Sequence, residues 1–324
     1  MLTLLKRLLL LALLSLTWPV LAATQAPTND PDVDVGIYIN RVDSLSYVKG
    51  NYVVDMTLWF RWRNPNLHPN KTFTIKGATI NHRRDEYDGQ MGKSGMHWAG
   101  VDIVASVPNK FDIEKFPFDA QKLLIQIEEV EQGAQVVNYR LDEAHMRLNP
   151  RLEIPGWRVN GDNAFITLNE YPTNFGYTDG KTNEAFVSSQ LNYELLLSRI
   201  SMLSSMKLIF APMVAILILF FTSLLPTTQG ARFGVGTTAI FALVSSHYLI
   251  LTQLPESNHI TIAEQIVVFG LLQALIYFMV TVYSFNLQDK GNSTAHKKVD
   301  TALALSLGAA DLLFAVYLIY RIQS

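Results

Sequence analysis

The segment from Arg232 to Pro255 constrains the fold most, because it is long enough to cross a bilayer yet carries polar residues at regular intervals. Its line of mostly small or polar side chains consists of Gly234, Thr238, Phe241, Ser245, Tyr248 and Thr252. The alternating spacing of four and three residues places them on one face of an α-helix. Two interpretations fit. The face packs against a neighbouring helix, as small residues favour, or it lines a water-filled pore built by several copies of the chain.

The composition divides the chain into a soluble part and a membrane part. Hydrophobic residues make up 49% of the 324 residues, and they are concentrated toward the C-terminus. The net charge of −2 and the lack of a basic stripe give no indication of nucleic-acid binding. Cysteine is absent, which excludes a disulfide framework, a thiol nucleophile and a cysteine-ligated metal. We expect no cofactor and no metal site.

Residues 1–22 have the pattern of a secretory signal peptide. Lys6 and Arg7 precede a leucine-rich run, and Val20-Leu21-Ala22 offers a cleavage site with a small residue. A retained membrane anchor is the alternative interpretation.

Residues 24–198 have the pattern of an extracellular β-domain. Apolar and polar residues alternate over 33–40, 52–62, 123–128, 164–171 and 186–196. Turn pairs such as Asn64-Pro65, Asp88-Gly89 and Asn149-Pro150 separate these runs. Half-buried strands with frequent turns predict an antiparallel β-sandwich.

Residues 199–324 predict a transmembrane domain with helices at about 201–225, 232–254, 262–286 and 299–321. The inner links hold Arg232, Lys290, Lys297 and Lys298, whereas the outer link at 256–264 has no Lys or Arg. A cleaved signal peptide places the β-domain outside, and this asymmetry agrees with that orientation for a multi-pass membrane protein. With the similarity to bacterial members described below, we expect the cell inner membrane. Asp311, in the fourth helix, is expected to meet a polar neighbour or lipid headgroups rather than an ion path.

The segment Asn109–Leu123, NKFDIEKFPFDAQKL, resembles the signature loop of the pentameric ligand-gated ion channels, the Cys-loop receptor superfamily. The residues that carry the resemblance are Asp112, Phe116, Pro117, Asp119 and Gln121. The segment 62–67 resembles a second family motif, and 231–238 resembles the start of the family's pore helix. The missing cysteines and the short inner link at 287–298 are similar to bacterial members.

The resemblance implies a homopentamer with five β-sandwiches above a ring of four-helix bundles. Its function would be that of a ligand-gated channel permeated by inorganic ions. The second helix of each subunit would line the pore with the six residues given above. Phe241 stands where a leucine is usual, and a ring of five such side chains would close the pore by dewetting.

The resemblance also implies an agonist site between subunits, built from aromatic side chains. The candidates are Tyr38, Trp59, Trp98, Glu128, Tyr171, Phe175, Tyr177 and Phe186. Aromatic faces and a carboxylate suit an amine, and protons are the second possibility. Val130 and Thr57 depart from the family pattern, since aromatic residues are expected at both positions.

Coupling between the domains is implied for Phe116, Pro117, Phe118, Asp119, Arg199 and Pro255. We predict an ion pair between Asp119 and Arg199 close to the membrane surface. His247 and His259 are candidates for a response to pH.

Ion selectivity stays open at this stage. Gly230-Ala231-Arg232 resembles the Pro-Ala-Arg of anion-conducting members and leans toward anions. Glu256 near the outer mouth favours cations, and Arg232 would have no influence if it pointed into the protein.

Two other functions compete with a channel. A non-conducting receptor would use the same ligand-binding β-domain without a pore. A membrane-anchored enzyme would need a catalytic arrangement, and the nearest candidates are 82–86 and the acidic run Glu128-Glu129-x-Glu131. We interpret that acidic run as solvated surface, and we expect no enzyme.

Overall fold

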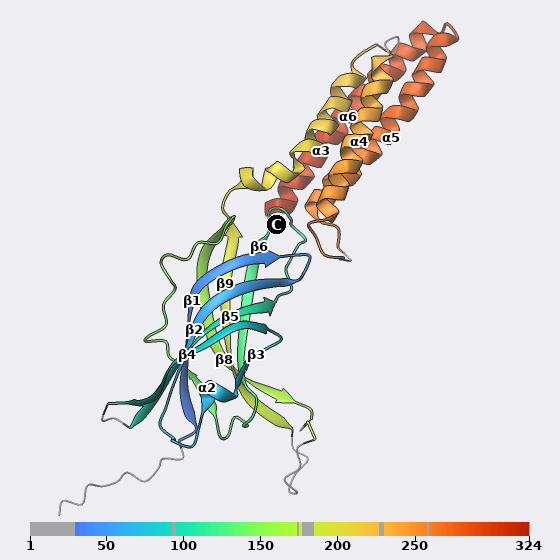
Figure 1. Cartoon of the computed structure of the whole chain (residues 1–324). Helices are drawn as coiled ribbons and strands as arrows, with labels where there is room; N and C mark the ends of the chain where they lie inside the picture. The colour runs from blue at the N-terminus through green and yellow to red at the C-terminus, as the bar shows by residue number, and fades with distance from the viewer. Residues whose placement is uncertain are drawn as a thin grey trace, which may run out of the picture.

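The computed structural model describes residues 30–92, 95–173, 175–176, 185–226, 230–257 and 259–323. A β-domain is followed by a bundle of long helices, and the two parts lie end to end (Figure 1). The predicted fold class, an extracellular antiparallel β-sandwich followed by a four-helix transmembrane bundle, is confirmed. The predicted signal peptide, residues 1–22, and the candidate Tyr177 lie outside the described residues.

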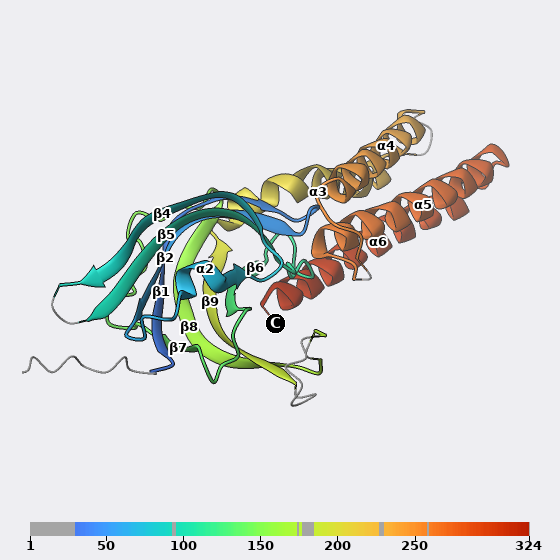
Figure 2. The same ribbon diagram turned by 60° about the horizontal axis from the view of Figure 1, so that its bottom comes forward.

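The β-domain consists of two sheets that face each other (Figure 2). The first sheet has the order β4-β5-β2-β1-β7, and its strands are β1 Asp32–Ser46, β2 Asn51–Trp62, β4 Thr79–Met91, β5 Met96–Pro108 and β7 Asn138–Leu141. The second sheet has the order β3-β6-β9-β8, and its strands are β3 Phe73–Ile75, β6 Ala120–Glu129, β8 Trp157–Tyr171 and β9 Phe186–Arg199. A short helix, α2 Pro69–Thr72, precedes β3.

Alternation along the strands produces the core between the sheets. In β2 every second residue from Tyr52 to Trp62 is buried, and the residues between them are half-buried. β6 and β9 supply Leu123, Ile125, Leu195 and Leu197 from the opposite sheet. Burying these side chains removes their apolar surface from water, which is the main favourable contribution to folding.

Two features of the sandwich differ from a simple alternating antiparallel pattern. β1 pairs with β7 in parallel, with Asp32 opposite Asn138. β4 is exposed along nearly its whole length and forms one edge of the first sheet. Its charged side chains suit an exposed edge, where they discourage pairing with other chains.

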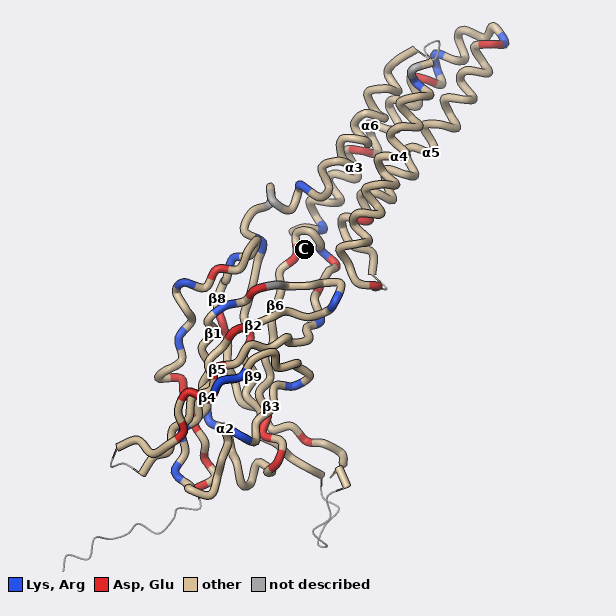
Figure 3. The backbone as a smooth tube through the Cα atoms, viewed as in Figure 1, with Lys and Arg blue, Asp and Glu red and all other residues tan. Residues whose placement is uncertain are grey.

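Four helices are long and apolar enough to cross a membrane in the described part of the chain. They are α3 Met202–Ser223, α4 Ala231–Leu251, α5 Ile262–Asp289 and α6 Ser293–Gln323. α6 begins six residues before the predicted start at 299, so the helix includes the basic residues Lys297 and Lys298. Lys, Arg, Asp and Glu are sparse along the bundle and gather toward its ends (Figure 3). The chain is therefore a multi-pass membrane protein with an extracellular N-terminal domain.

The C-terminus lies next to the β-domain, beside the end of α6 (Figure 1). Four crossings return the chain to the side from which it entered, so α6 ends close to the signature loop, Asn109–Leu123. Asp311, half-way along α6, accepts a hydrogen bond of 2.8 Å from Gln273 Nε2 of α5. The expectation of a polar neighbour for Asp311 is confirmed.

Candidate functional site

Helix α4 has two contrasting faces. The six residues Gly234, Thr238, Phe241, Ser245, Tyr248 and Thr252, which we call the polar stripe, are all exposed in the single chain. Phe241 and Tyr248 are 69% and 68% exposed. The opposite face is buried against the bundle and consists of Arg232, Gly236, Ala239, Leu243, Ser246 and Ile250. The chain's own helices therefore leave the polar stripe uncovered.

Hydroxyl groups on α4 bond back to the helix itself. Thr238 Oγ1 donates to the Gly234 carbonyl at 2.9 Å, and Ser246 Oγ donates to the Ala242 carbonyl at 2.8 Å. A hydroxyl that donates inward still has lone pairs that can accept from water. Thr238 can therefore stand in an apolar environment or face a wet passage without an unsatisfied donor.

An apolar groove of about 700 Å³ runs between α3 and α4. Phe210 and Ala215 line it from α3, whereas Gly234 and Thr238 line it from α4. The groove borders the polar stripe, so this side of the bundle presents an uncovered apolar surface next to a hydroxyl-bearing one.

At the junction of the two domains, Asp119 of the signature loop pairs with Arg199 at the end of β9. The predicted ion pair is present, with Arg199 Nε donating to Asp119 Oδ1 at 3.1 Å. Tyr47 and Gln121 also donate to the Asp119 carboxylate, at 2.5 and 2.6 Å. Burial, together with the neighbouring Asp119 charge, raises the pKa of Tyr47, so its hydroxyl keeps its proton and remains a donor. Asp119 is only 3% exposed, and its charge is held by these three groups.

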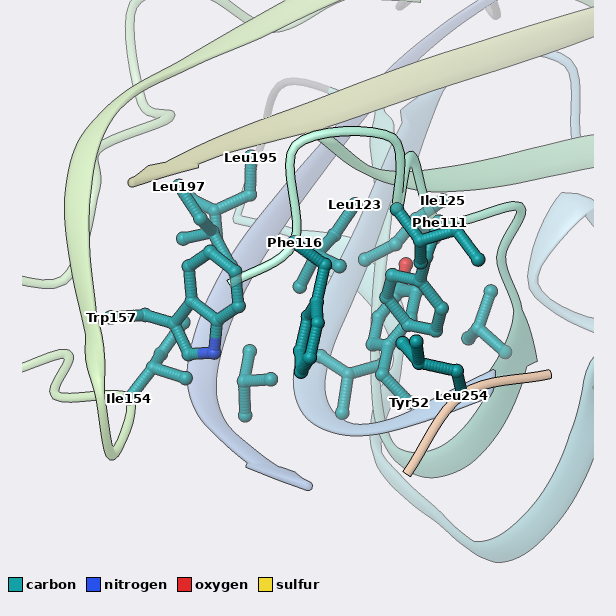
Figure 4. Close-up of a cluster of buried hydrophobic side chains, with 14 of the residues drawn as sticks. Tyr52, Phe111, Phe116, Leu123, Ile125, Ile154, Trp157, Leu195, Leu197 and Leu254 are labelled. Carbon is teal, nitrogen blue, oxygen red and sulfur yellow. The ribbon is translucent and has the colours of Figure 1, made fainter. Parts of the chain in front are cut away.

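Aromatic side chains surround this ion pair. The Arg199 guanidinium lies 4.1 Å from the ring centroid of Trp157 and 5.7 Å from that of Phe116. Phe111 and Phe116 belong to the same buried cluster as Leu254, from the link after α4 (Figure 4). Cation–π attraction and apolar packing thus act together at one place. The signature loop is consequently in contact with both the β-domain and the helical domain.

A backbone hydrogen bond joins the signature loop directly to α5. The Ala263 N–H donates to the Phe116 carbonyl at 3.1 Å. Thr261 and Glu264 form a capping box that begins α5 at this point. The Phe116–Pro117 peptide bond is cis, and Phe118 packs partly buried against the core.

A cavity of about 590 Å³ opens at the same junction. It is lined by the loop after β1, the signature loop and the link after α4, including Pro255, Glu256 and His259. At its edge, Arg321 of α6 lies 2.7 Å from the Glu114 carboxylate. The outer ends of α4, α5 and α6 therefore all reach the signature loop or its surroundings.

In the β-domain, Glu128 is the centre of a buried polar cluster on the second sheet. Its carboxylate accepts from Tyr171 Oη at 2.8 and 2.9 Å, from Asn169 Nδ2 at 3.2 Å, and from Ser188 Oγ. Lys76 Nζ lies 3.4 Å from Tyr171 Oη. The Tyr171 phenol thus contacts both a carboxylate and an ammonium group.

Three aromatic rings continue this cluster toward the tip of the β8–β9 hairpin. The ring centroids of Tyr171 and Phe175 are 5.2 Å apart, and those of Phe175 and Phe186 are 6.2 Å apart. Phe175 is largely exposed and adopts a positive φ of 54°. The structure therefore brings together four of the predicted ligand residues: Glu128, Tyr171, Phe175 and Phe186.

No protein-family model matches the chain. A proton-gated ion channel of Gloeobacter violaceus (strain ATCC 29082 / PCC 7421) is 24% identical to it over 178 residues, which is 55% of this chain. The chain matches only 46% of that relative's length. In addition, this chain has a β-sandwich, a signature loop at the domain junction and four apolar helices. Its β-sandwich and four apolar helices fit the architecture of the pentameric ligand-gated ion channels.

The other predicted ligand residues in the described part of the chain lie on the first sheet. Trp59 Nε1 donates to the buried Asp142 carboxylate at 2.8 Å, and the Trp59 ring covers Gly36. A Cβ at position 36 would lie 2.2 Å from this ring, so the close packing requires glycine. Trp98 packs against Tyr87, with their ring centroids 5.6 Å apart. Tyr38 is half-buried on β1. A single subunit therefore does not unite these three residues with the Glu128 cluster.

The interpretation of the acidic run as solvated surface is wrong for Glu128 and Glu129, whereas Glu131 is exposed. Glu128 and Glu129 are both buried, although they point to opposite faces of β6. Glu129 accepts from Thr72 Oγ1 at 2.5 Å and from two backbone N–H groups, at 3.0 and 3.2 Å. Burial raises the pKa of Glu129 despite these hydrogen bonds. Side chains cover both faces of this end of β6: Thr72 lies against Glu129, and Asn169, Tyr171 and Ser188 lie against Glu128.

Sequence reasoning missed several partners of the predicted residues. Asn169 and Ser188 sit opposite each other on β8 and β9, and both reach Glu128. Tyr47 and Gln121, which both donate hydrogen bonds to the Asp119 carboxylate, were also missed as its partners. The parity of Asn169 and Tyr171 on one strand was available as a signal, but the register that brings Ser188 beside them depends on the fold.

Proposed function

We propose that five copies of this chain assemble into a ligand-gated ion channel whose pore is lined by the polar stripe of α4. The observation that carries this proposal is the two-faced character of α4. One face packs into the bundle, and the other exposes glycine and hydroxyl groups at the depth of the membrane.

The contrast with the other helices supports a wet environment for the polar stripe. Most exposed side chains along the middle of α5 and α6 are large and apolar, as contact with lipid requires. They include Leu272, Leu275 and Met279 on α5 and Leu312, Leu313 and Val316 on α6. Polar groups inside a membrane face the interior of a bundle or a water-filled cavity. The polar stripe of α4 therefore belongs toward a shared axis.

The apolar groove between α3 and α4 supports the assembly of several copies. Lipid or a neighbouring subunit can cover an apolar surface, but the groove lies directly beside the polar stripe. A neighbour that covers the groove also excludes lipid from the stripe. The number five follows from the family resemblance.

Phe241 and Tyr248 are the bulkiest side chains of the polar stripe and are our candidates for the gate. Both project away from the bundle, with more than two thirds of each side chain exposed. A ring of apolar side chains stops ions when it becomes too narrow to hold water. Phe241 suits that role best, because it has no polar atom.

The agonist site in this proposal lies between neighbouring subunits. Glu128, Tyr171 and Phe186 contribute from one subunit, and Tyr38 and Trp98 contribute from the next. The two groups lie on different sheets of the same chain, so only a second copy brings them together. A carboxylate beside aromatic faces favours an amine. Protons are the second stimulus to test, since the similar channel from Gloeobacter violaceus is proton-gated.

Introduced cysteines test the pore, because the chain has no cysteine of its own. Thr238→Cys places a thiol on the polar stripe, and Ala239→Cys places one on the buried face one residue further along. The protein is reconstituted in planar bilayers, amines and acid are screened for currents, and a charged thiol reagent is added from the bath. We expect the reagent to block currents through the Thr238→Cys channel and to spare Ala239→Cys.

A different result would contradict a pore lined by this face. In that result Thr238→Cys and Ala239→Cys react equally with a lipid-soluble thiol reagent, neither reacts with the charged reagent, and the current does not change. Absence of any current under every stimulus, together with specific ligand binding, would favour a non-conducting receptor instead.

A further inference from the structure

Arg232 lies on the face of α4 opposite the polar stripe. It is 0% exposed in the single chain, so its side chain is covered by the subunit's own helices before any assembly. It begins the buried line that continues through Gly236 and Ala239. Arg232 and Gly234 are two residues apart, which is roughly 200° around an α-helix. Assembly can only add to this burial.

The buried guanidinium is paired with an acid from another helix. Arg232 Nη1 lies 3.0 Å from Asp300 Oδ1 of α6. Ser284 Oγ of α5 donates to the same Asp300 oxygen at 2.7 Å. The Asp300 side chain is only 16% exposed. Removing only one partner of such a deeply buried ion pair strongly destabilises the folded protein, because the other charge stays buried without a partner.

Tyr277 of α5 fixes the backbone at the same point. Its hydroxyl donates to the Arg232 carbonyl at 2.9 Å, and its ring centroid lies 5.9 Å from the guanidinium carbon. Tyr277 also fills the space above Gly236, where a Cβ would lie 2.8 Å from the ring. Side chains from α5 and α6 thus cover Arg232, and turning its guanidinium toward the polar stripe would break the ion pair with Asp300 and the contact with the Tyr277 ring.

This arrangement leaves the polar stripe without a formal charge. Arg232 is the only Lys, Arg, Asp or Glu between Lys207 and Glu256 in the sequence. Glu256 follows Thr252 by four residues, beyond the outer end of α4, and it is exposed. Lys49 and Lys110 line the same junction cavity, but neither forms an ion pair with Glu256 among the described residues. The first charge next to the outer end of the stripe is therefore acidic.

We propose that Arg232 is a structural anchor outside the ion path, and that a ring of Glu256 side chains makes the channel prefer cations. The inference rests on the proposed channel function, and it reverses the lean toward anions that residues 230–232 give when they are taken from the sequence alone. Carboxylates around a pore mouth concentrate cations and repel anions.

Reversal potentials in asymmetric NaCl test the selectivity. The wild-type channel should reverse near the sodium equilibrium potential, and Glu256→Gln should move the reversal potential toward that of chloride. The double variant Arg232→Gln/Asp300→Asn removes both buried charges at once and should leave the reversal potential unchanged. A wild-type channel that prefers chloride, or a double variant that shifts the reversal potential, overturns the proposal.

Thermal unfolding in detergent tests the anchor without any current. Asp300→Asn leaves Arg232 buried without its acid and should lower the melting temperature, whereas the double variant should recover part of the loss. An Asp300→Asn protein as stable as the wild type overturns the anchor. A stable, folded protein that shows the expected unfolding pattern but conducts no ions speaks against the channel function and not against the anchor.

Discussion

Arg199 Nε donates to Asp119 Oδ1 at 3.1 Å, and this contact joins the last strand of the β-domain to the loop that touches the helices. Both residues also bind the Tyr47 hydroxyl, so three segments from distant parts of the sequence meet at one carboxylate. The ion pair therefore lies on the path by which the β-domain would influence the pore.

Arg199→Ala should destabilise the protein and uncouple ligand binding from opening. It leaves the Asp119 carboxylate buried without its cation, which costs about 3–5 kcal/mol in comparable cases. The measurements are thermal unfolding and agonist-evoked current, normalised to the amount of protein at the membrane surface. Arg140→Ala is the matched control, because Arg140 pairs with Asp32 on an exposed surface and its loss should have little effect. Normal opening of Arg199→Ala channels would exclude the pair from coupling.

The contact between Arg321 and Glu114 should depend on pH. The hydrogen bond from Arg321 lowers the pKa of Glu114, so the carboxylate ionises more readily in the folded protein. Its contribution to stability is therefore present above the ordinary glutamate pKa and is lost as the pH falls through the lowered value. Hydrogen exchange at the end of α6 should distinguish Arg321→Ala from the wild type at pH 7. The two proteins should converge in acid and also at high salt, because the pair is partly exposed. A difference that persists at the most acidic pH at which the protein stays folded would show that Arg321 acts through other contacts.

Phe241→Ala should widen the proposed gate and produce a standing current without agonist. The side chain is largely exposed in the single chain, so its truncation removes little packing within the subunit. Val244→Ala is the control, since Val244 is also exposed on α4 but lies off the polar stripe. Current recorded before agonist addition separates the two variants. A closed Phe241→Ala channel would move the gate to another ring, with Tyr248 as the next candidate.

Glu128→Gln should weaken the response to an amine agonist. It keeps the shape of the side chain but removes the charge, and a hydrogen bond to a charged group is worth about 1.5–3 kcal/mol. The concentration for half-maximal current should therefore rise about 10- to 100-fold. Glu194→Gln serves as the control, because Glu194 lies on β9 but pairs with Lys122 away from the Glu128 cluster. An unchanged concentration–response curve would place the amine elsewhere.

The features that depend on local pattern could be predicted from the sequence. The alternation from Tyr52 to Trp62 identifies β2, and the uncharged runs identify the membrane helices, because burial of one face or of a whole segment leaves a periodic record. β4 was not predicted, since an edge strand exposed on both faces has no such alternation. The parallel pairing of Asp32 with Asn138 was also missed, because nothing local specifies a partner more than 100 residues away.

The side-chain partners of the candidate site depend on long-range geometry. Arg232 finds its acid at Asp300, and Glu128 finds Ser188, across distances that spacing rules do not cover. Trp59 was predicted as a ligand residue from its position on the polar side of β2. In the structure its indole N–H binds Asp142, and its ring packs on Gly36. Parity along a strand shows which way a side chain points, but it does not show what already occupies that side.

The hydrogen bond from the Ala263 N–H to the Phe116 carbonyl uses only main-chain atoms. Every amino acid except proline supplies the same donor, and every amino acid supplies the same acceptor. This link between the domains can therefore survive the replacement of nearly all the side chains around it during evolution. Substitutions could therefore change the stimulus or the permeant ion while this hydrogen bond between the two domains is kept.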